Sequence, residues 1–346
     1  MKYEGHGAQG NLFDYLDRMA GKGLPPSALD RLDSVVYWED FREPIEQILQ
    51  LRGGTEKGGR PPKDTVLMWK ICVLQNYYGL SDEQTEIQIA DRLSFQRFLG
   101  LGPSDKVPDR NTIWTFKERL SDKGVRLLFE DLNEHLKNNG LLPKTGKMID
   151  ATFVEAPRQR NKREENEQIK EGKRPENFDE NPHRGAQKDT DARWTKKNDE
   201  VHFGYKNHTK VNAATKMVED YCVSAACVHD SQALPELTKP EDPSLYADSA
   251  YAGEPIAKDL ESKRIVNCVH EKGTRGHPLS EGQKELNRLR SKVRARIEHV
   301  YGWMTQHGDL KVRSIGLKRA ARFIGLRNIV YNLFRMEYYM RNKAIA

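Results

Sequence analysis

Three acidic residues stand where packing alone gives no reason for a charge. Asp150 follows Met148 and Ile149 within an apolar segment, and Asp248 follows the apolar run LYA at the end of another. Glu298 lies among basic residues in a long stretch of helical character. Because an ionised carboxylate at such a position must be paired, hydrogen-bonded or bound to a metal, all three acids are candidates for chemistry.

Carboxylates from three separate elements suit metal-dependent chemistry on phosphodiesters. Hard cations take oxygen ligands, and two Mg²⁺ ions about 4 Å apart can activate an attacking oxygen and stabilise a leaving one. Taken singly, each acid is more typical of a helix cap or a turn. As a set, in the order strand, strand, helix, Asp150, Asp248 and Glu298 predict a site for two Mg²⁺ ions, with Mn²⁺ as a substitute.

Residues 1 to about 140 are predicted to be helical, because apolar residues recur every three or four positions and strand-like alternation is scarce. Asp64 or Thr65 can cap a helix that Gly79 ends, and Ser81 has the spacing to begin a second one with a capping box. We therefore expect an all-helical N-terminal domain.

A third helix is predicted to begin at Asp109, which can cap RNTIWTFKERL with Ile113, Phe116 and Leu120 on one face. The three helices together predict a helix-turn-helix bundle, in which the polar first turn of the last helix can enter a major groove. Its candidate DNA contacts are Arg110, Asn111, Thr112 and Lys117. The alternative is that the bundle only packs against another domain or a second copy.

The pattern changes after Gly140. β-Branched and aromatic residues between turn signals predict strands in KMIDATFVEA, VHFGYKNHTKVNAAT and MVEDYCVSAACV. After them come a helix near Ser231, a strand in SLYADSAYAG, a helix in EPIAKDLESK, a strand in RIVNCVHEK and a long helix from Ser280. This order predicts an α/β domain over 141–346, with a mixed sheet covered by helices.

A charged insertion of about 158–200 interrupts the first predicted hairpin. It contains 12 Lys or Arg and 11 Asp or Glu with few apolar residues, so it is not expected to bury a core of its own. Trp194 is the one large apolar anchor that we assign to it. We expect this segment to be mobile without DNA.

The net charge of +6 over 346 residues is modest, but the basic residues are concentrated at one end. From Lys284 to Ala346 there are 15 Lys or Arg against four acids, so the rest of the chain is net negative. Such a basic segment suits a surface that follows phosphates, although a charge run is often only a solvated helix face.

The cysteines stand singly in apolar stretches, without the spacing of a zinc site: Cys72, Cys222, Cys227 and Cys268. They predict buried thiols in a reducing compartment. No stretch approaches the length of a membrane span, and MKYEGHGAQG lacks the apolar centre of a signal peptide. We therefore expect a cytoplasmic protein with no membrane part.

The segments around the three acids resemble insertion-sequence-five-type transposases, a branch of the DDE transposases with a ribonuclease-H-like fold. The matching pieces are MIDATFVEAP, HFGYKNHTKVNAAT, CVHDSQ, LYADSAYAG and RARIEH, within roughly residues 60 to 340. The resemblance implies Asp150, Asp248 and Glu298 as the catalytic triad. It also implies a prokaryotic, nucleoid-associated homodimer or higher oligomer that binds double-stranded DNA at the element's terminal inverted repeats and at the target.

The family's C-terminal signature is Tyr, two residues, Arg, three residues, Glu, six residues, Lys. Arg294 and Glu298 have this spacing, but Ser291 stands at the Tyr position and Thr305 at the Lys position, so no DNA contact is carried over to those two. The candidate phosphate contacts on this helix are Arg290, Lys292 and Arg294. Arg294 can instead serve only as an ion-pair partner of Glu298 one turn away.

The implied reaction is hydrolysis at the element's ends, followed by attack of the freed 3′-hydroxyl on a target phosphate. Two alternatives stay open: a non-transposing nuclease of the same fold, and an inactive DNA-binding regulator. Four other polar residues are weaker site candidates. His229 and Asp230 could approach the metals, although Asp230 is more typical of a helix cap, and His202 and His208 could contact DNA or stabilise the hairpin.

Overall fold

Side chains that cap helix ends divide the N-terminal part of the chain into helices. Asp64 accepts a backbone N–H at 2.8 Å and begins α4 (Thr65–Tyr78), and Gly79, with a left-handed φ of 64°, ends it. Ser81 accepts a backbone N–H at 3.1 Å at the start of α5 (Asp82–Asp91). Both predicted helix starts are confirmed, but of the predicted capping box at Ser81 only the bond from the Gln84 N–H to the Ser81 side chain is seen.

The third predicted helix is longer than its predicted segment. α7 (Arg110–Asn138) begins after Asp109, whose carboxylate accepts the N–H of Thr112 at 2.8 Å as predicted. The residues of its predicted apolar face are buried, namely Ile113, Phe116 and Leu120. At Ser121 the backbone leaves the helical region, with φ 59° and ψ 176°, so α7 consists of two helical pieces.

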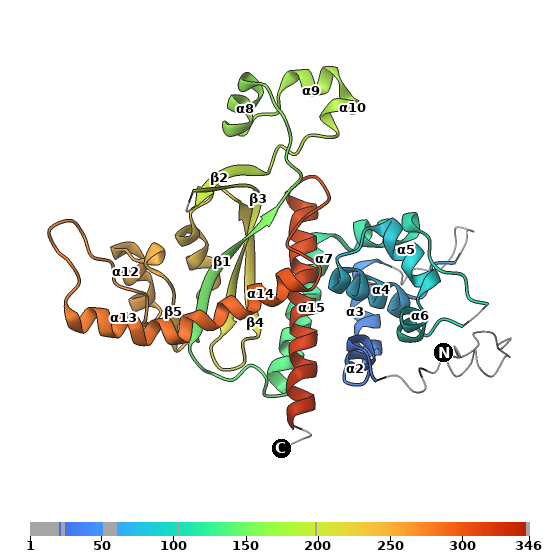
Figure 1. The fold of residues 1–346 in the computed structure, drawn as a ribbon, viewed down its shortest axis with the longest axis horizontal. Helices are drawn as coiled ribbons and strands as arrows, with labels where there is room; N and C mark the ends of the chain where they lie inside the picture. The colour runs from blue at the N-terminus through green and yellow to red at the C-terminus, as the bar shows by residue number, and fades with distance from the viewer. Residues whose placement is uncertain (1–20, 22–24, 51–60, 103, 198, 344–346) are drawn as a thin grey trace, which may run out of the picture. The chain divides into compact units, whose positions relative to one another are not determined.

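The structure, a computed structural model, describes residues 21, 25–50, 61–102, 104–197 and 199–343 (Figure 1). The chain divides into two units, one of Met1–Leu120 with Glu337–Ala346 and the other of Ser121–Met336. Besides α4, α5 and the first part of α7, the described residues of the first unit form α2 (Ala28–Asp33), η1 (Trp38–Phe41), α3 (Arg42–Ile48), α6 (Leu93–Leu99) and the end of α15 (Leu317–Lys343).

The second unit contains a mixed six-stranded sheet, as predicted for this part of the chain. Its strands are β1 (Lys147–Glu155), β2 (Arg193–Lys197), β3 (Glu200–Asn212), β4 (Val218–Ala225), β5 (Ser244–Tyr246) and β6 (Val266–Asn267). The order is β2-β3-β1-β5-β6, with β4 also pairing β3. β3 is antiparallel to β1, β2 and β4, whereas β1, β5 and β6 are parallel. The strand predicted in RIVNCVHEK is reduced to the two residues of β6.

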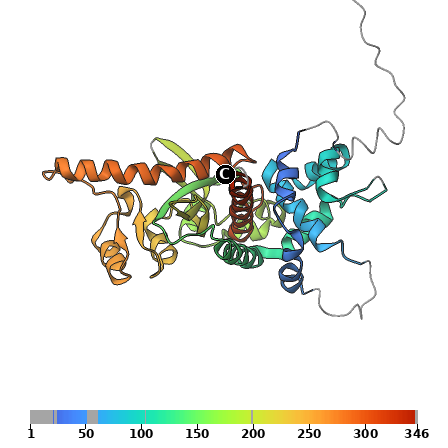
Figure 2. The same cartoon turned by 90° about the horizontal axis from the view of Figure 1, so that it is seen from below.

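Helices complete this unit. Besides the second part of α7 and most of α15, they are α8 (Arg163–Lys170), α9 (Glu176–Glu180), α10 (Pro182–Gly185), η2 (Asp230–Ala233), α11 (Leu234–Leu237), η3 (Ser249–Tyr251), α12 (Glu254–Ser262), α13 (Glu281–Arg294), η4 (Ala295–Ile297) and α14 (Glu298–Gln306). An apolar cluster packs α11 and α12 against β1 and β5 through Leu234, Leu260, Ile149 and Leu245. Figures 1 and 2 show α13, η4 and α14 as one nearly continuous helical run.

The insertion between β1 and β2 has a small core of its own, so the prediction that it could bury none is wrong. Phe178 is fully buried and Ile169 is 6% exposed, whereas Trp194 is 44% exposed. Glu165, buried beside them, accepts hydrogen bonds from Asn177 and Arg184. These mutual contacts allow a segment with few apolar residues to form α8, α9 and α10 (Figure 1).

No helix in the described ranges of the chain combines the length and the apolar character needed to cross a membrane.

Candidate active site

Two neighbouring parallel strands bring two of the candidate acids to the same level of the sheet. The pairing of β1 with β5 sets Lys147 opposite Leu245 and Met148 opposite Tyr246. Asp150 and Asp248 each follow two residues beyond the last of these pairs. Because paired strands lie about 4.8 Å apart, this register predicts that the two carboxylates are neighbours. Their electrostatic interaction agrees, since the charge of Asp248 acts to raise the pKa of Asp150.

The carboxylate of Asp150 is largely enclosed, with 15% of its side chain exposed. One oxygen accepts the N–H of Ala151 at 2.8 Å, and the other accepts from Arg294 Nη1 at 3.2 Å. Burial, with the negative charge of Asp248, raises the Asp150 pKa to about 6 against the opposing effects of the Ala151 hydrogen bond, Arg294 and Lys197. A carboxylate whose charge is this poorly compensated attracts a further cation.

Asp248 lies at the start of η3, where its Oδ1 accepts the N–H of Ala250 at 2.8 Å. It is therefore a capping residue, as each acid taken singly was expected to be. The cap uses only one of the two carboxylate oxygens, and within the described residues no donor is seen at the other. Capping leaves Asp248 able to serve as a metal ligand.

Glu298, the first residue of α14, is joined to Asp150 through a cation. Arg294 Nη1 lies 3.2 Å from Asp150 Oδ2, and its Nη2 lies 3.6 Å from Glu298 Oε1. The Glu298 side chain is 65% exposed, whereas Arg294 is 21% exposed. In the described part of the chain, no three His, Cys, Asp or Glu side chains are grouped closely enough to hold a metal ion. The structure thus sets Asp150 and Asp248 at the ends of neighbouring strands and links Glu298 to Asp150 by Arg294.

Tyr301 was missed by the sequence reasoning, although it follows Glu298 by three residues on the same helix. Its hydroxyl donates to the backbone oxygen of Asp150 at 2.7 Å and lies 2.7 Å from Thr209 Oγ1 on β3. Burial, together with the charge of Asp150, raises its pKa well above the ordinary value, so the hydroxyl keeps its proton. Tyr301 therefore fixes α14 to the strand that carries Asp150.

The two basic neighbours of Arg294 differ in their surroundings. Arg290 donates to the backbone oxygen of Val269 at 2.9 Å and lies 3.5 Å from Glu271, so it anchors α13 to the segment after β6. Lys292 is exposed. Ser291, at the position of the family's Tyr, lies 3.2 Å from His270 Nε2. Of the predicted phosphate contacts on α13, Lys292 is the most accessible.

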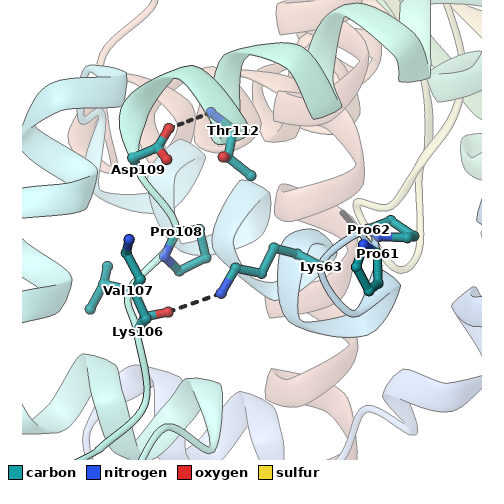
Figure 3. A pocket seen from close by; sticks show the side chains of 8 residues that line it. All are labelled: Pro61, Pro62, Lys63, Lys106, Val107, Pro108, Asp109 and Thr112. Atoms are coloured by element: carbon teal, nitrogen blue, oxygen red, sulfur yellow. Dashed lines mark hydrogen bonds between the residues drawn. The ribbon is translucent and has the colours of Figure 1, made fainter. Parts of the chain in front are cut away.

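The candidate DNA contacts of the first unit lie at the start of α7. Arg110 is 57% exposed and forms an ion pair of 3.2 Å with Glu83. Asn111 and Thr112 line a cavity of about 390 Å³. A second cavity, of about 150 Å³, adjoins Thr112 and Asp109, and Lys63 donates to the Lys106 backbone across it (Figure 3).

Lys117 is held inside the first unit. Its ammonium group contacts Asp82 and donates to Gln75 at 2.9 Å, and 17% of the side chain is exposed. These contacts tie α7 to α4 and α5. Lys117 was predicted as a DNA contact behind the polar first turn, and these contacts show that it has partners within the first unit.

The other polar candidates have structural partners. His208 is fully buried, with Nε2 2.7 Å from Ser224 Oγ, and burial lowers its pKa to about 4. His202 stacks on Phe153. Asp230 pairs with Lys206 at 2.7 Å, and the residue that caps η2 is His229 rather than the expected Asp230. The two histidines of β3 therefore support the hairpin.

The prediction that all four cysteines are buried is wrong. Cys72 is buried in α4, Cys222 and Cys268 are partly exposed, and Cys227 is exposed in the turn after β4. Burial raises the pKa of the Cys222 thiol to about 12, so it stays protonated. The apolar neighbours in sequence did not show which side of each strand faces the core.

Comparison with known proteins adds three findings. Residues 142–333 match the Transposase DDE domain, and residues 19–119 match the Transposase domain (DUF772). Among solved structures, the chain is similar to a piggyBac transposase in a synaptic complex with hairpin DNA, at 10% identity and a TM-score of 0.45. That similarity covers 92% of this chain and 75% of the other.

Proposed function

The chain belongs to the DDE transposase family, and we propose that it binds the ends of an insertion sequence, cleaves them and joins them to target DNA. It is an enzyme of DNA transposition. Within the family we place it in the insertion-sequence-five-type branch, on the motifs MIDATFVEAP, LYADSAYAG and RARIEH.

The observation that carries the proposal is the pairing of Asp150 with Asp248 inside the matched domain. The register of β1 and β5 sets them side by side, and the raised pKa of Asp150 reflects both its burial and the charge of Asp248. Two acids crowded in this way destabilise the folded protein unless a cation joins them. Carboxyl groups with a pKa raised in this way are typical of catalytic and ligand-binding sites.

We propose a ribonuclease-H-like core for this domain. Support comes from three antiparallel strands, β1, β3 and β4, followed by β5 and β6 parallel to β1 on its other side. In that fold, carboxylates on the first strand, after the fourth strand and on a late helix surround one site. Asp150, Asp248 and Glu298 occupy those positions, with β5 counted as the fourth strand of the core.

DDE transposases use divalent metal ions, and the residues present fit such ions. Their donors are carboxylate oxygens, which hard cations prefer, and Asp150 carries a charge that its neighbours leave poorly compensated. We propose that Asp150, Asp248 and Glu298 hold two Mg²⁺ ions, for which Mn²⁺ can substitute. When bound, the ions activate the attacking oxygen and stabilise the leaving oxygen of the phosphodiester.

Other side chains of the second unit bind phosphate and hold the acidic residues in place. Arg294 presents a planar guanidinium beside Asp150, and on release from that carboxylate it can hold a phosphate by paired hydrogen bonds. Lys292 is exposed two residues before Arg294 on α13 and adds a second positive charge to this helix. Tyr301 keeps α14, and with it Glu298, in place on β1. No covalent intermediate with the protein is required.

We assign recognition of the end sequences to the first unit. Arg110 and Asn111 are exposed at the start of α7, where side chains of a recognition helix meet base edges. Thr112 completes the turn. Lys117 is left out of this contact because Asp82 and Gln75 hold it.

Bringing two ends and a target together requires more than one copy, so we propose a homodimer or a higher oligomer. We also propose that it acts on the prokaryotic nucleoid in the cytoplasm, where such elements reside. Both proposals rest on the resemblance to insertion-sequence transposases.

Strand transfer tests the proposal. The protein is incubated with Mg²⁺, a target plasmid and DNA whose element ends are already cleaved, and joined products are measured. We expect joining that depends on the end sequence. A parallel reaction uses DNA with uncut ends. Cleavage there without joining of the pre-cleaved ends would indicate a nuclease, and binding without either reaction would indicate a regulator.

A further inference from the structure

His270 lies in line with the two aspartates, and the mechanism above gives it no role. β5 and β6 are parallel, and their hydrogen bonds continue past the end of β6 to the His270 N–H, which donates to the Ala247 backbone oxygen at 3.1 Å. This register makes His270 the neighbour of Asp248, as Asp248 is the neighbour of Asp150. Because neighbouring strands lie about 4.8 Å apart, the three residues form a row across the sheet.

The three side chains of this row point to the same face of the sheet. The residues that directly precede them are Ile149, Ala247 and Val269, and all three belong to the apolar cluster that packs α11 and α12 against the sheet. Successive side chains of a strand alternate between the two faces. The two carboxylates and the imidazole therefore lie together on the face away from that cluster.

α13 contacts both ends of the row. Arg294 donates to the Asp150 carboxylate at 3.2 Å. Ser291, three residues earlier on the helix, has its Oγ 3.2 Å from His270 Nε2. The same turn of α13 therefore extends from His270 to Asp150, with Asp248 between them in the row. His270 is thus part of the site in which the metal ions are proposed to bind.

The contact with Ser291 determines which ring nitrogen of His270 is free. The Ser291 hydroxyl has one proton, which it donates to the Asn287 backbone oxygen at 2.8 Å, so it can only accept from His270. In the neutral ring we therefore assign the proton to Nε2 and a lone pair to Nδ1. Within the described residues no hydrogen bond is found at Nδ1. A histidine that binds a metal ion typically donates its other ring N–H to a fixed acceptor in this way.

We propose that His270 is a further metal ligand of the site, and that its Nδ1 binds the ion held by Asp248. This inference rests on the proposed function of the same site. In the described part of the chain the side chains of the row are not close enough to hold an ion, and Arg294 holds Asp150. The register fixes the backbone positions, so ion binding requires only that side chains turn. Imidazole suits transition-metal ions better than Mg²⁺, so this ligand makes the site favour Mn²⁺ over Mg²⁺.

His270→Ala in the full-length chain tests the inference through metal selectivity. Mn²⁺ and Mg²⁺ are titrated separately by calorimetry, without DNA. We expect Mn²⁺ binding to weaken by about 10-fold or more and Mg²⁺ binding to weaken less, so the preference for Mn²⁺ should fall. The melting temperature should change little, because His270 is partly exposed. Pulsed electron paramagnetic resonance should show coupling of bound Mn²⁺ to a histidine nitrogen in the wild-type protein and not in the variant.

His208→Ala is the matched control, since His208 also contacts a serine, with its Nε2 2.7 Å from Ser224 Oγ. It is fully buried on β3, and the next residue, Thr209, is the one that pairs with Asp150, so His208 points to the opposite face of the sheet. Its replacement should lower the melting temperature and leave the preference for Mn²⁺ unchanged.

Three results would overturn the inference: a wild-type preference for Mn²⁺ in His270→Ala, bound Mn²⁺ without coupling to a histidine nitrogen, or an equal loss of preference in His208→Ala. If His270→Ala loses the preference for Mn²⁺ but the wild-type protein joins no DNA, the metal-ligand role stands and the proposed function fails.

Discussion

Arg294 decides how the acidic residues of the site are held together. Its guanidinium lies between Asp150 and Glu298, at 3.2 and 3.6 Å. Its Nε is buried without a partner in the described structure, so the side chain is only partly satisfied where it lies. A group in this situation can exchange a carboxylate for a phosphate at little cost. The sequence predicted its pairing with Glu298 but not its contact with Asp150. The predicted phosphate contact stays a prediction.

Arg294→Ala should have opposite effects on the two ligands. We expect Mn²⁺ to bind several-fold more tightly, because the ion no longer competes with the guanidinium for Asp150. DNA should bind more weakly, and the slope of log affinity against log salt should fall by about 1, because one phosphate contact is lost. Titration calorimetry and a salt series of binding isotherms measure both.

Arg294→Lys serves as the control for charge. It keeps the positive charge but lacks the planar fork, so it should retain the salt slope. If Arg294→Ala leaves the DNA salt slope and Mn²⁺ affinity untouched and only lowers the melting temperature, Arg294 is a structural ion-pair partner alone.

Two of the candidate acids could be predicted because their neighbours in sequence are apolar. A charge directly after Met148 and Ile149, or after LYA, stands out from the sequence itself. The contact of Tyr301 could not be predicted in this way. Tyr301 reaches Asp150 across 151 positions, and that contact follows from how α14 lies on β1. The local periodicity of apolar residues does not specify which distant segments will contact each other.

At the scale of elements, helix starts were predicted well and the insertion poorly. Asp64, Ser81 and Asp109 cap their helices through contacts only three residues long, which local sequence specifies fully. In the insertion, Glu165 and Phe178 are buried together with partners 12 to 19 positions from Glu165. A count of charged and apolar residues does not show which of them contact each other. The composition of the insertion therefore led to the wrong prediction that it has no core.

The buried carboxylate of Glu165 should stabilise the insertion locally. It accepts from Asn177 at 2.7 Å, from Arg184 and from the Lys162 N–H at 2.8 Å. Glu165→Ala leaves these donors without an acceptor, which we expect to lower local stability by about 1–3 kcal/mol. Hydrogen exchange should then speed up over 163–185 and stay unchanged in β1 and β3.

Glu167→Ala on the same helix is the comparison. Its carboxylate is 59% exposed and pairs with the 90% exposed Arg163, so its loss should change exchange very little. Equal acceleration in both variants would mean that α8 is held by helix propensity and not by the Glu165 contacts.

Two residues on α7 should separate DNA recognition from packing. Asn111→Ala removes an exposed amide at the start of the helix, and we expect the preference for the end sequence over random DNA to fall by roughly 10-fold. Its melting temperature should not change. Lys117→Ala breaks contacts with Asp82 and Gln75, so it should lower the melting temperature and keep the preference. Fluorescence anisotropy with both DNAs measures the first effect.

If Asn111→Ala bound the end sequence and random DNA with the wild-type ratio, the start of α7 would not read the sequence. The first unit would then be assigned to packing or dimerisation, the alternative that the helical pattern left open.

At the scale of the whole molecule, the chain combines a helical unit and a mixed-sheet unit, and each matches a transposase domain. The sequence predicted the change from helices to a sheet because the period of apolar residues changes after Gly140. The division itself lies at Ser121, inside α7, where one non-helical residue interrupts the helix. Because the residues before and after Ser121 both have a helical pattern, the sequence did not indicate a division there.

The account depends most on Asp150 and Asp248 forming one metal-dependent centre. The direct test is the rate of Mg²⁺-dependent cleavage of DNA with the element's flanked ends, by the wild-type protein and by Asp248→Asn. Asparagine can still accept the N–H of Ala250 and removes a charge that crowds Asp150, so the variant should fold with an unchanged or higher melting temperature. We expect its cleavage to be lost, with DNA binding retained. Cleavage by the folded variant at the wild-type rate would contradict the account.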